Sequence, residues 1–265
     1  MEETDQTHEE VSTPPRKPAK PSFGRRVARL LGEGALILVG AVVISILLRT
    51  FVAQMFVIPS GSMENTLQVG DRVLVAKFGG FQRGDVVVFE DPSNWLNTQP
   101  EASSPVREVL EFIGVLPSSD TEHLIKRVVG MPGDNVKCCD DQGRIEVNDA
   151  TLDERAYLFA HDGVQVAPAN VPFEIVVPDQ HLFVLGDHRN ASADSRCRLS
   201  NVAQGQPRGM DAFVPVDRVV GASVAIVAPL NRLSTFNVPG TYLGVPAAAS
   251  PAPEAPELID VNPGC

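Results

Sequence analysis

Two side chains in this sequence have the chemistry of a nucleophile and its base. Ser62 lies in the segment PSGSM at residues 59–63, and a serine among Gly and Ser ordinarily marks no more than a turn. Lys126 lies in the run LIKRVV at 124–129, where an amine is unusual because burying its charge is costly. Burial favours the neutral amine, so such a lysine could take a proton from a serine hydroxyl near neutral pH. The alternative is a lysine at a strand end with its ammonium group in solvent.

A third segment, GDHRNASADSR at residues 186–196, combines charged side chains with two serines directly after an apolar run. Its chemistry-bearing residues are Asp187, Arg189, Ser192, Asp194, Ser195 and Arg196. Taken alone, the segment is equally typical of a solvated loop whose ion pairs contribute little. A Ser-His-Asp apparatus is not indicated, because the sequence has no G-x-S-x-G elbow. The four cysteines offer no C-x-x-C pair, so no metal site is predicted either.

The elements that must position these residues are predicted to be strands. Short β-branched runs separated by Gly, Pro and Asp indicate a mostly β domain. The runs occupy residues 71–78, 85–90, 124–130, 135–139, 144–148, 181–187 and 219–229. A smaller β region is expected at about 138–178, and an irregular insertion at about 91–122 contains the one clear helical pattern, at 106–116.

An apolar run at 34–48, preceded by a cluster of Lys and Arg without acids, predicts one transmembrane helix over 34–54. The positive-inside rule then puts the N-terminus in the cytoplasm and the rest of the chain outside. A cleavable secretory signal is the alternative, but the residues after the run lack a clear small-x-small site.

Both ends of the chain have the composition of tails. Residues 1–29 are predicted to be a disordered basic cytoplasmic tail, and the Pro/Ala-rich residues 239–265 a flexible one. The part between them, 56–238, is then the extracytoplasmic domain. Nucleic acid is not an expected partner, because a net charge of -11 offers no basic surface for phosphates.

The segments PSGSM, GDRVLVAKF, KRVVGMPGD and GDHRNASADSR, in this order and behind one apolar helix, resemble the successive sequence boxes of the bacterial type I signal peptidases. The resemblance implies a coiled antiparallel β-sheet catalytic core with a smaller inserted β region. It implies a membrane-bound serine endopeptidase that removes signal peptides from translocated secretory pre-proteins through an acyl-enzyme. No cofactor is implied, and a monomer is expected in the lipid bilayer of the cell membrane. Substrates should carry A-x-A-type cleavage sites.

The resemblance also implies a role for individual residues. Ser62 would be the nucleophile, Lys126 its general base, Ser60 an oxyanion-hole donor and Ser192 the hydroxyl that orients the lysine amine. The charged residues that would brace the site are Arg127, Asp187, Asp194 and Arg196. The residues that would form the substrate pocket are Phe56, Ile58, Leu74 and Ile125. The segment departs from the commonest family pattern at His188, Asn190 and Ala191.

Two other functions stay open at this point. A self-cleaving Ser/Lys hydrolase would share the dyad, and a catalytically inactive membrane-tethered binding protein would share the fold. The cysteines give a further hypothesis, because thiols in an exported domain tend to pair. Adjacent cysteines rarely bond to each other, so a disulfide is expected between Cys197 and either Cys138 or Cys139.

Overall fold

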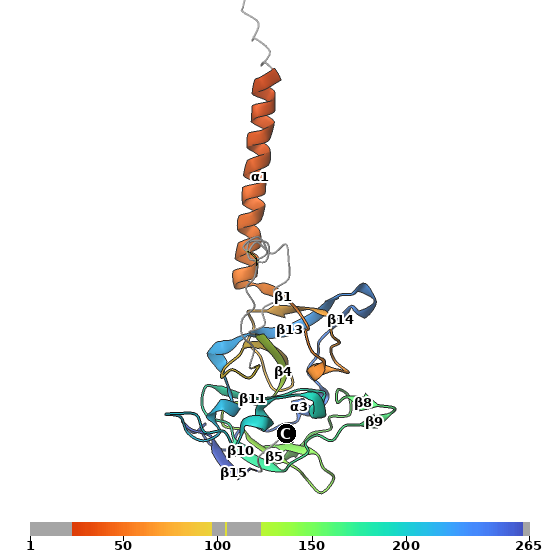
Figure 1. Ribbon diagram of the computed structural model, residues 1–265, viewed down its shortest axis with the longest axis vertical. Coiled ribbons are helices and arrows are strands. Elements are labelled where there is room, and N and C mark those ends of the chain that lie inside the picture. The colour runs from red at the N-terminus through yellow and green to blue at the C-terminus, as the bar shows by residue number, and fades with distance from the viewer. Residues whose placement is uncertain (1–22, 97–103, 105–122, 262–265) are drawn as a thin grey trace, which may run out of the picture. The chain divides into compact units, whose positions relative to one another are not determined.

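The computed structural model describes residues 23–96, 104 and 123–261 of the chain (Figure 1). The helical pattern at 106–116, nearly all of the predicted insertion and the first 22 residues therefore lie outside the described residues.

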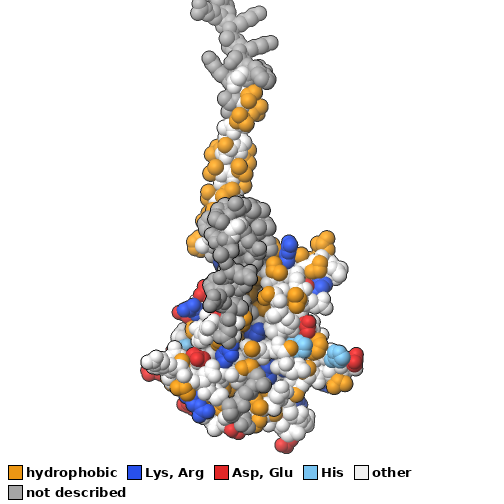
Figure 2. Space-filling model, viewed as in Figure 1, with side chains coloured by type: hydrophobic (Ala, Val, Ile, Leu, Met, Phe, Trp, Pro, Cys, Tyr) orange, Lys and Arg blue, Asp and Glu red, His pale blue; other side chains and the backbone are white. Residues whose placement is uncertain are grey.

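The apolar run forms one long helix, α1, over Phe23–Phe51. Within its stretch from Arg29 to Phe51, an 18-residue window has a mean hydropathy of 2.4, and none of this window is buried in the protein. Figure 2 shows hydrophobic side chains along this helix. At 1.5 Å per residue, this stretch spans about 35 Å, enough to cross the apolar core of a bilayer.

The ends of this helix differ from the prediction. It begins before residue 34, so residues 23–29 are helical and the predicted disordered tail is wrong there. It ends at Phe51 because Ala53–Val57 forms strand β1, which pairs with β2. Hydropathy alone does not separate an apolar strand from the end of an apolar helix.

The main sheet is antiparallel and has the order β1-β2-β13-β3-β4-β11-β12, with β14 paired to β13. Its strands are β1 (Ala53–Val57), β2 (Arg72–Ala76), β3 (Val86–Glu90), β4 (His123–Gly130), β11 (His181–Leu185), β12 (Val214–Pro215), β13 (Val219–Ala228) and β14 (Ser234–Thr235). The β-branched runs predicted to be strands are confirmed. Strand β4 lies between β3 and β11, and this position buries both of its faces.

A second antiparallel sheet has the order β15-β10-β5-β6-β7. Its strands are β5 (Asn135–Cys138), β6 (Ile145–Val147), β7 (Ala150–Thr151), β10 (Phe173–Val176) and β15 (Glu257–Val261), and β8 (Ala160–His161) forms a hairpin with β9 (Val164–Gln165). The short helices are η1 (Gly61–Met63), η2 (Arg189–Ala191), η3 (Ser195–Arg198), η4 (Met210–Ala212), η5 (Val216–Arg218), η6 (Leu230–Arg232) and α3 (Gly240–Leu243).

The segment after residue 239 is part of the folded domain, so the prediction of a flexible tail is wrong for residues 240–261. Tyr242 in α3 is 5% exposed, and β15 pairs with β10. The Pro246 carbonyl accepts a hydrogen bond from the Asn148 amide at 2.9 Å, and the Pro253 carbonyl accepts one from Asp179 N–H at 2.8 Å. A Pro/Ala composition predicts no structure of its own, but these tertiary contacts fix the segment.

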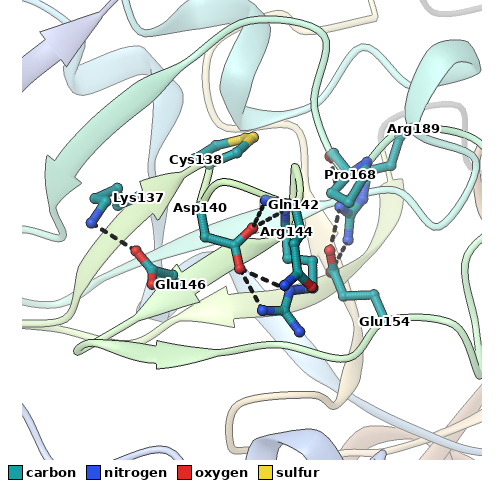
Figure 3. The surroundings of a disulfide bond; sticks show 10 residues. Lys137, Cys138, Asp140, Gln142, Arg144, Glu146, Glu154, Pro168 and Arg189 are labelled. Carbon is teal, nitrogen blue, oxygen red and sulfur yellow. Dashed lines mark hydrogen bonds and ion pairs between the residues drawn. A yellow bond between two sulfur atoms is a disulfide. The ribbon is translucent and has the colours of Figure 1, made fainter.

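The predicted cysteine pairing is also wrong. Cys138 and Cys139 form a disulfide with each other at the end of β5 (Figure 3). Neither sulfur is therefore available to Cys197, so the predicted bridge from Cys197 to Cys138 or Cys139 is wrong.

At Gly221, the backbones of β13 and β2 approach each other closely. A Cβ atom at this position would lie 2.0 Å from the Ala76 carbonyl oxygen. Backbone atoms cannot give way as the end of a flexible side chain can, so the two strands would have to separate.

We expect Gly221→Ala to lower the free energy of unfolding by about 1–3 kcal/mol, the usual cost of overpacking. Gly240→Ala is the control, since a Cβ there meets nothing within 4 Å. Thermal and urea unfolding would measure both variants. Equal stabilities for the two would contradict the close approach.

Candidate active site

Ser62 is held in the short helix η1, just after β1. Its neighbour Met63 and the following Leu67 are both fully buried and pack in the core beneath β1 and β2. The Ser62 carbonyl accepts a hydrogen bond from His188 N–H at 3.1 Å. The turn is therefore tied both to the core and to the segment after β11, and Ser62 itself is only 7% exposed.

Lys126 projects from the middle of β4, where it pairs with Val87 of β3. Its residue is 4% exposed, so the alternative of an ammonium group in solvent is wrong. Lys126 Nζ donates to Ser62 Oγ at 2.7 Å and to the Ile125 carbonyl at 3.0 Å. The structure thus brings the predicted nucleophile and the predicted base into direct contact.

The environment of Lys126 weakens its hold on a proton. Burial lowers the pKa of Lys126 to about 8, and the positive charge of Arg198 acts in the same direction. The carboxylates of Asp194 and Asp187 act against this effect but do not cancel it. At pH 7 about a tenth of the amines are then neutral, compared with fewer than about one in a thousand for an ordinary lysine.

The other cations buried around the site each have a carboxylate of their own. Arg127 binds Asp187 through two hydrogen bonds of 2.8 and 2.6 Å, and Arg196 binds Asp194 through two of 2.9 Å. Figure 3 shows the third pair, Arg189 with Glu154, whose side chains are 1% and 2% exposed. Among the residues that the structure describes, Lys126 contacts no carboxylate. Burying it therefore destabilises its charged form.

Asp194 also stays ionised despite its burial. Burial alone would raise the pKa of the Asp194 carboxyl, but the charge and hydrogen bonds of Arg196 hold that pKa below its ordinary value. One Asp194 oxygen accepts a hydrogen bond from Gly186 N–H at 3.0 Å. The four charged residues that were expected to brace the site thus form two ion pairs, Arg127–Asp187 and Arg196–Asp194, and Asp194 is fastened to the end of β11.

Gly186 is where the parts of the site crowd together. A Cβ atom on Gly186 would lie 2.3 Å from Ser192 Oγ and 2.5 Å from the Ser62 carbonyl oxygen. Only glycine leaves room for the turn with Ser62 and the loop with Ser192 to meet here.

The two remaining serines differ in burial. Ser192 is 6% exposed, and its Oγ makes no hydrogen bond of full geometry within the described part of the chain. It is nevertheless close enough to the Asp194 carboxylate to help lower the pKa of that group. Ser60 is exposed, in an extended backbone conformation just before η1, and its side chain does not cap that helix.

Three of the predicted pocket residues lie in one core cluster. Phe56, Ile58 and Ile125 are 5%, 2% and 7% exposed and pack with Met63. Leu74 is half-buried on β2 and lies outside this cluster. The cluster that anchors the turn with Ser62 therefore contains three of the four expected pocket residues.

The sequence did not reveal several contacts around the site. Glu154 pairs with Arg189 although the two are 35 residues apart. Thr66 donates its hydroxyl to Asp187, and the His188 ring lies 2.9 Å from a Glu64 carboxylate oxygen. The sequence offered one indication of these contacts, namely Arg189 in the charged segment 186–196, because a buried arginine needs an acidic partner. That indication does not identify Glu154 as the partner.

A family model described as signal peptidase, peptidase S26, matches residues 31–228 of this chain. The chain belongs to the signal peptidase family. Relatives in this family include signal peptidase I of Mycobacterium tuberculosis strain H37Rv, which is 35% identical over 221 residues covering 76% of this chain and 74% of that protein. Signal peptidase I of Leptolyngbya laminosa is 33% identical over 235 residues, 87% of this chain and 96% of that protein. Signal peptidase I S of Bacillus subtilis is 32% identical over 192 residues, 69% and 87% of the two chains.

A crystal structure of a signal peptidase I from Enterococcus faecalis also matches, with a TM-score of 0.32 and 20% identity over 55% of this chain and 97% of that one. That likeness is too low to add to the family assignment. The predicted family and the mostly β fold are confirmed by the family match and by the two antiparallel sheets.

We expect Lys126 of this signal peptidase family member to titrate near pH 8. An NMR titration of side-chain Cε resonances in lysine-labelled protein, with Lys126→Met to assign the signal, would measure this. Lys137 is an internal control, because its hydrogen bond with Glu146 raises its pKa and keeps it charged at that pH. If Lys126 and Lys137 titrated together, the buried amine would not be depressed.

Proposed function

We propose that Ser62 and Lys126 form the catalytic dyad of a membrane-anchored serine endopeptidase that removes signal peptides from secretory pre-proteins. The hydrogen bond of 2.7 Å between Lys126 Nζ and Ser62 Oγ, away from solvent, carries this proposal. Membership of the signal peptidase family supplies the reaction, and the contact supplies the atoms that perform it.

The neutral amine of Lys126 takes the proton of Ser62 Oγ while the oxygen attacks the scissile carbonyl. The tetrahedral intermediate collapses, the ammonium of Lys126 gives the proton to the departing amine, and an ester joins Ser62 to the signal peptide. In the second half-reaction, water attacks this ester and Lys126 takes the proton from the water. Collapse returns that proton to Ser62 and releases the carboxylate.

Two more serines complete the proposed apparatus. The Ser60 hydroxyl, which is free to rotate because it is exposed, would join a backbone N–H in stabilising the oxyanion. Loss of one such donor typically costs about 2.7–4 kcal/mol of transition-state stabilisation. Ser192, packed against Gly186, would keep the amine of Lys126 aimed at Ser62 Oγ. Arg127, Asp187, Asp194 and Arg196 would hold this arrangement without contacting the substrate.

The apolar helix α1 and the basic segment before it support the proposed topology. The N-terminus would lie in the cytoplasm, the single helix in the lipid bilayer, and the domain from residue 56 onward outside the cell membrane. We propose that the enzyme acts there as a monomer, on pre-proteins that have already crossed the membrane.

The self-cleaving hydrolase and the inactive binding protein remain distinguishable alternatives. The contact between Ser62 and Lys126 speaks against an inactive protein. Incubating the detergent-solubilised full chain with a purified pre-protein separates the three functions. Cleavage of the pre-protein at one site supports the peptidase, cleavage of the chain itself supports the self-cleaving hydrolase, and no cleavage supports the binding protein.

We expect Ser62→Ala, and separately Lys126→Met, to lower kcat by on the order of 10³-fold or more, because nucleophile and base act as a unit. Lys126→Met keeps the volume of the side chain while it removes the amine. Circular dichroism and thermal unfolding would check that both variants fold. A Lys126→Met variant that kept more than about a tenth of the wild-type kcat would contradict the dyad.

Substrate choice follows from an extended substrate beside an apolar wall. In an added strand, alternate side chains face the enzyme, which accounts for small residues at the first and third positions before the cut. We propose that Phe56, Ile58, Leu74 and Ile125 form the wall facing them. Bulky side chains on the wall leave room for little more than a methyl group, and an oversized residue is rejected by a clash.

We expect an Ala→Leu change at the first position before the cut to block cleavage by the wild-type enzyme. Ile125→Ala should relax this requirement, and the milder Ile125→Val should do so partly if the alanine variant is too unstable. Ile226→Val is the matched control, since it trims the same core cluster on β13. Gel assays with the paired pre-proteins would measure the ratio of cleavage rates. Efficient cleavage of the Leu pre-protein by the wild type would sink this account of specificity while leaving the dyad intact.

A further inference from the structure

A chain of buried hydrogen bonds leads from the C-terminal segment toward the dyad. The hydroxyls of Tyr242 and Tyr157 lie 2.9 Å apart, and Tyr157 donates to Glu154 at 2.6 Å. Glu154 pairs with Arg189, as the dashed lines in Figure 3 show. All four side chains belong to residues that are at most 5% exposed, so water does not compete with these bonds.

This series of hydrogen bonds ends at the backbone of Gly186, where Ser62 and Ser192 pack most closely. Arg189 Nε donates to the Gly186 carbonyl at 2.9 Å, while the Gly186 N–H is held by Asp194. The Arg189 carbonyl in turn accepts a hydrogen bond of 2.7 Å from Arg196, the partner of Asp194. Gly186 packs against both Ser62 and Ser192. The hydrogen bonds from Arg189 and to Asp194 therefore fix the backbone against which the dyad packs.

A second branch runs through the tyrosine rings. The guanidinium of Arg127 lies 4.2 Å from the centre of the Tyr157 ring and binds Asp187. Arg127 also donates to the Gly84 carbonyl at 2.7 Å, and the Tyr242 ring packs so closely on Gly84 that a Cβ there would lie 2.7 Å from it. Both tyrosines therefore support the residue next to Lys126 on β4.

The two phenols act as hydrogen-bonding groups and not as acids. Burial, reinforced by the nearby charge of Glu154, raises the pKa of Tyr157 and the pKa of Tyr242. Both hydroxyls keep their protons over the working pH range. Tyr242 lies beyond residue 228, where the match to the signal peptidase family model ends.

From these contacts we propose that Tyr242 is a positioning residue for the catalytic dyad, and that the C-terminal segment is a working part of the active site. It acts through Tyr157 on two branches, one through Glu154 and Arg189 to Gly186, the other through Arg127 to Asp187. The inference rests on the proposed Ser62–Lys126 chemistry. Loss of the Tyr242 hydroxyl would leave the buried Tyr157 oxygen with Glu154 as its one remaining partner among these residues. This loss would loosen the branch through Glu154 and Arg189, while the ring contacts with Arg127 and Gly84 would remain.

The effect should be visible in the pH profile. The charged groups that face Lys126 are Asp187 after β11, Asp194 in the following loop and Arg198 in η3. When the backbone around Gly186 loosens, water reaches the Lys126 amine and partly hydrates it. The pKa of Lys126 then rises toward that of an ordinary lysine, and a larger fraction of the enzyme has a protonated, inactive base at neutral pH.

The experiment measures kcat and kcat/KM for cleavage of a pre-protein between pH 6 and 10, with the full-length chain in detergent. Wild type, Tyr242→Phe and Tyr157→Phe are compared, and Leu243→Ala is the control because that neighbouring side chain is 76% exposed. Each phenylalanine variant should lose about three- to tenfold in kcat at pH 7, the range expected for one buried hydrogen bond. The acidic limb of kcat/KM should move to higher pH, with KM near the wild-type value.

Three results would overturn the proposal. One is a wild-type pH profile and kcat in Tyr242→Phe. Another is a loss that is equal at every pH, which would indicate a smaller folded fraction. The third is the same shift in Leu243→Ala. Tyr157→Phe removes the next hydroxyl in the same series of hydrogen bonds. If one of the two variants folds poorly, the other still tests the proposal. Failure of the proposed function itself would be seen separately, as cleavage by Ser62→Ala or none by the wild type.

Discussion

Charge burial around one lysine is the constraint on which the structure depends. Three arginines are buried near the dyad, and each is paired with a carboxylate: Arg127 with Asp187, Arg189 with Glu154, and Arg196 with Asp194. Within the described residues, the buried Lys126 has only the Ser62 hydroxyl and a backbone carbonyl as partners. The low polarity of this interior strengthens the attraction within each arginine–carboxylate pair. The same low polarity destabilises the unpaired ammonium of Lys126, so this amine loses its proton more easily.

Both sheets contribute residues that keep Lys126 unpaired beside the paired arginines. The main sheet supplies Lys126 on β4 and, after β1, the turn that carries Ser62. The region of the second sheet supplies Glu154 and Tyr157, and the chain beyond residue 239 supplies Tyr242. Segments far apart in the sequence therefore converge on Gly186. The geometry of the dyad is a property of the whole domain, since no single loop holds it.

Much of this could be predicted from the sequence, for identifiable reasons. β-branched runs marked the strands, and a lysine inside one of them marked the proposed base, since burial is the unusual fate of an amine. The end of α1 could not be found from hydropathy, because β1 is also apolar. The order of the Pro/Ala segment depends on a place for Tyr242 beside Gly84, and the partner of Arg189 lies in a different part of the chain. Composition and spacing record neither contact.

The strand β15 has a consequence for a protein that handles unfolded chains. An open sheet edge presents unpaired N–H and C=O groups to which any extended polypeptide can add. β15 covers the edge of β10 and becomes the outermost strand itself. Its exposed residues include Glu257 and Asp260, and charged side chains on an outer strand discourage further pairing. The segment that reaches inward through Tyr242 thus also covers the edge of β10 and places two acidic side chains on the outer strand of the second sheet.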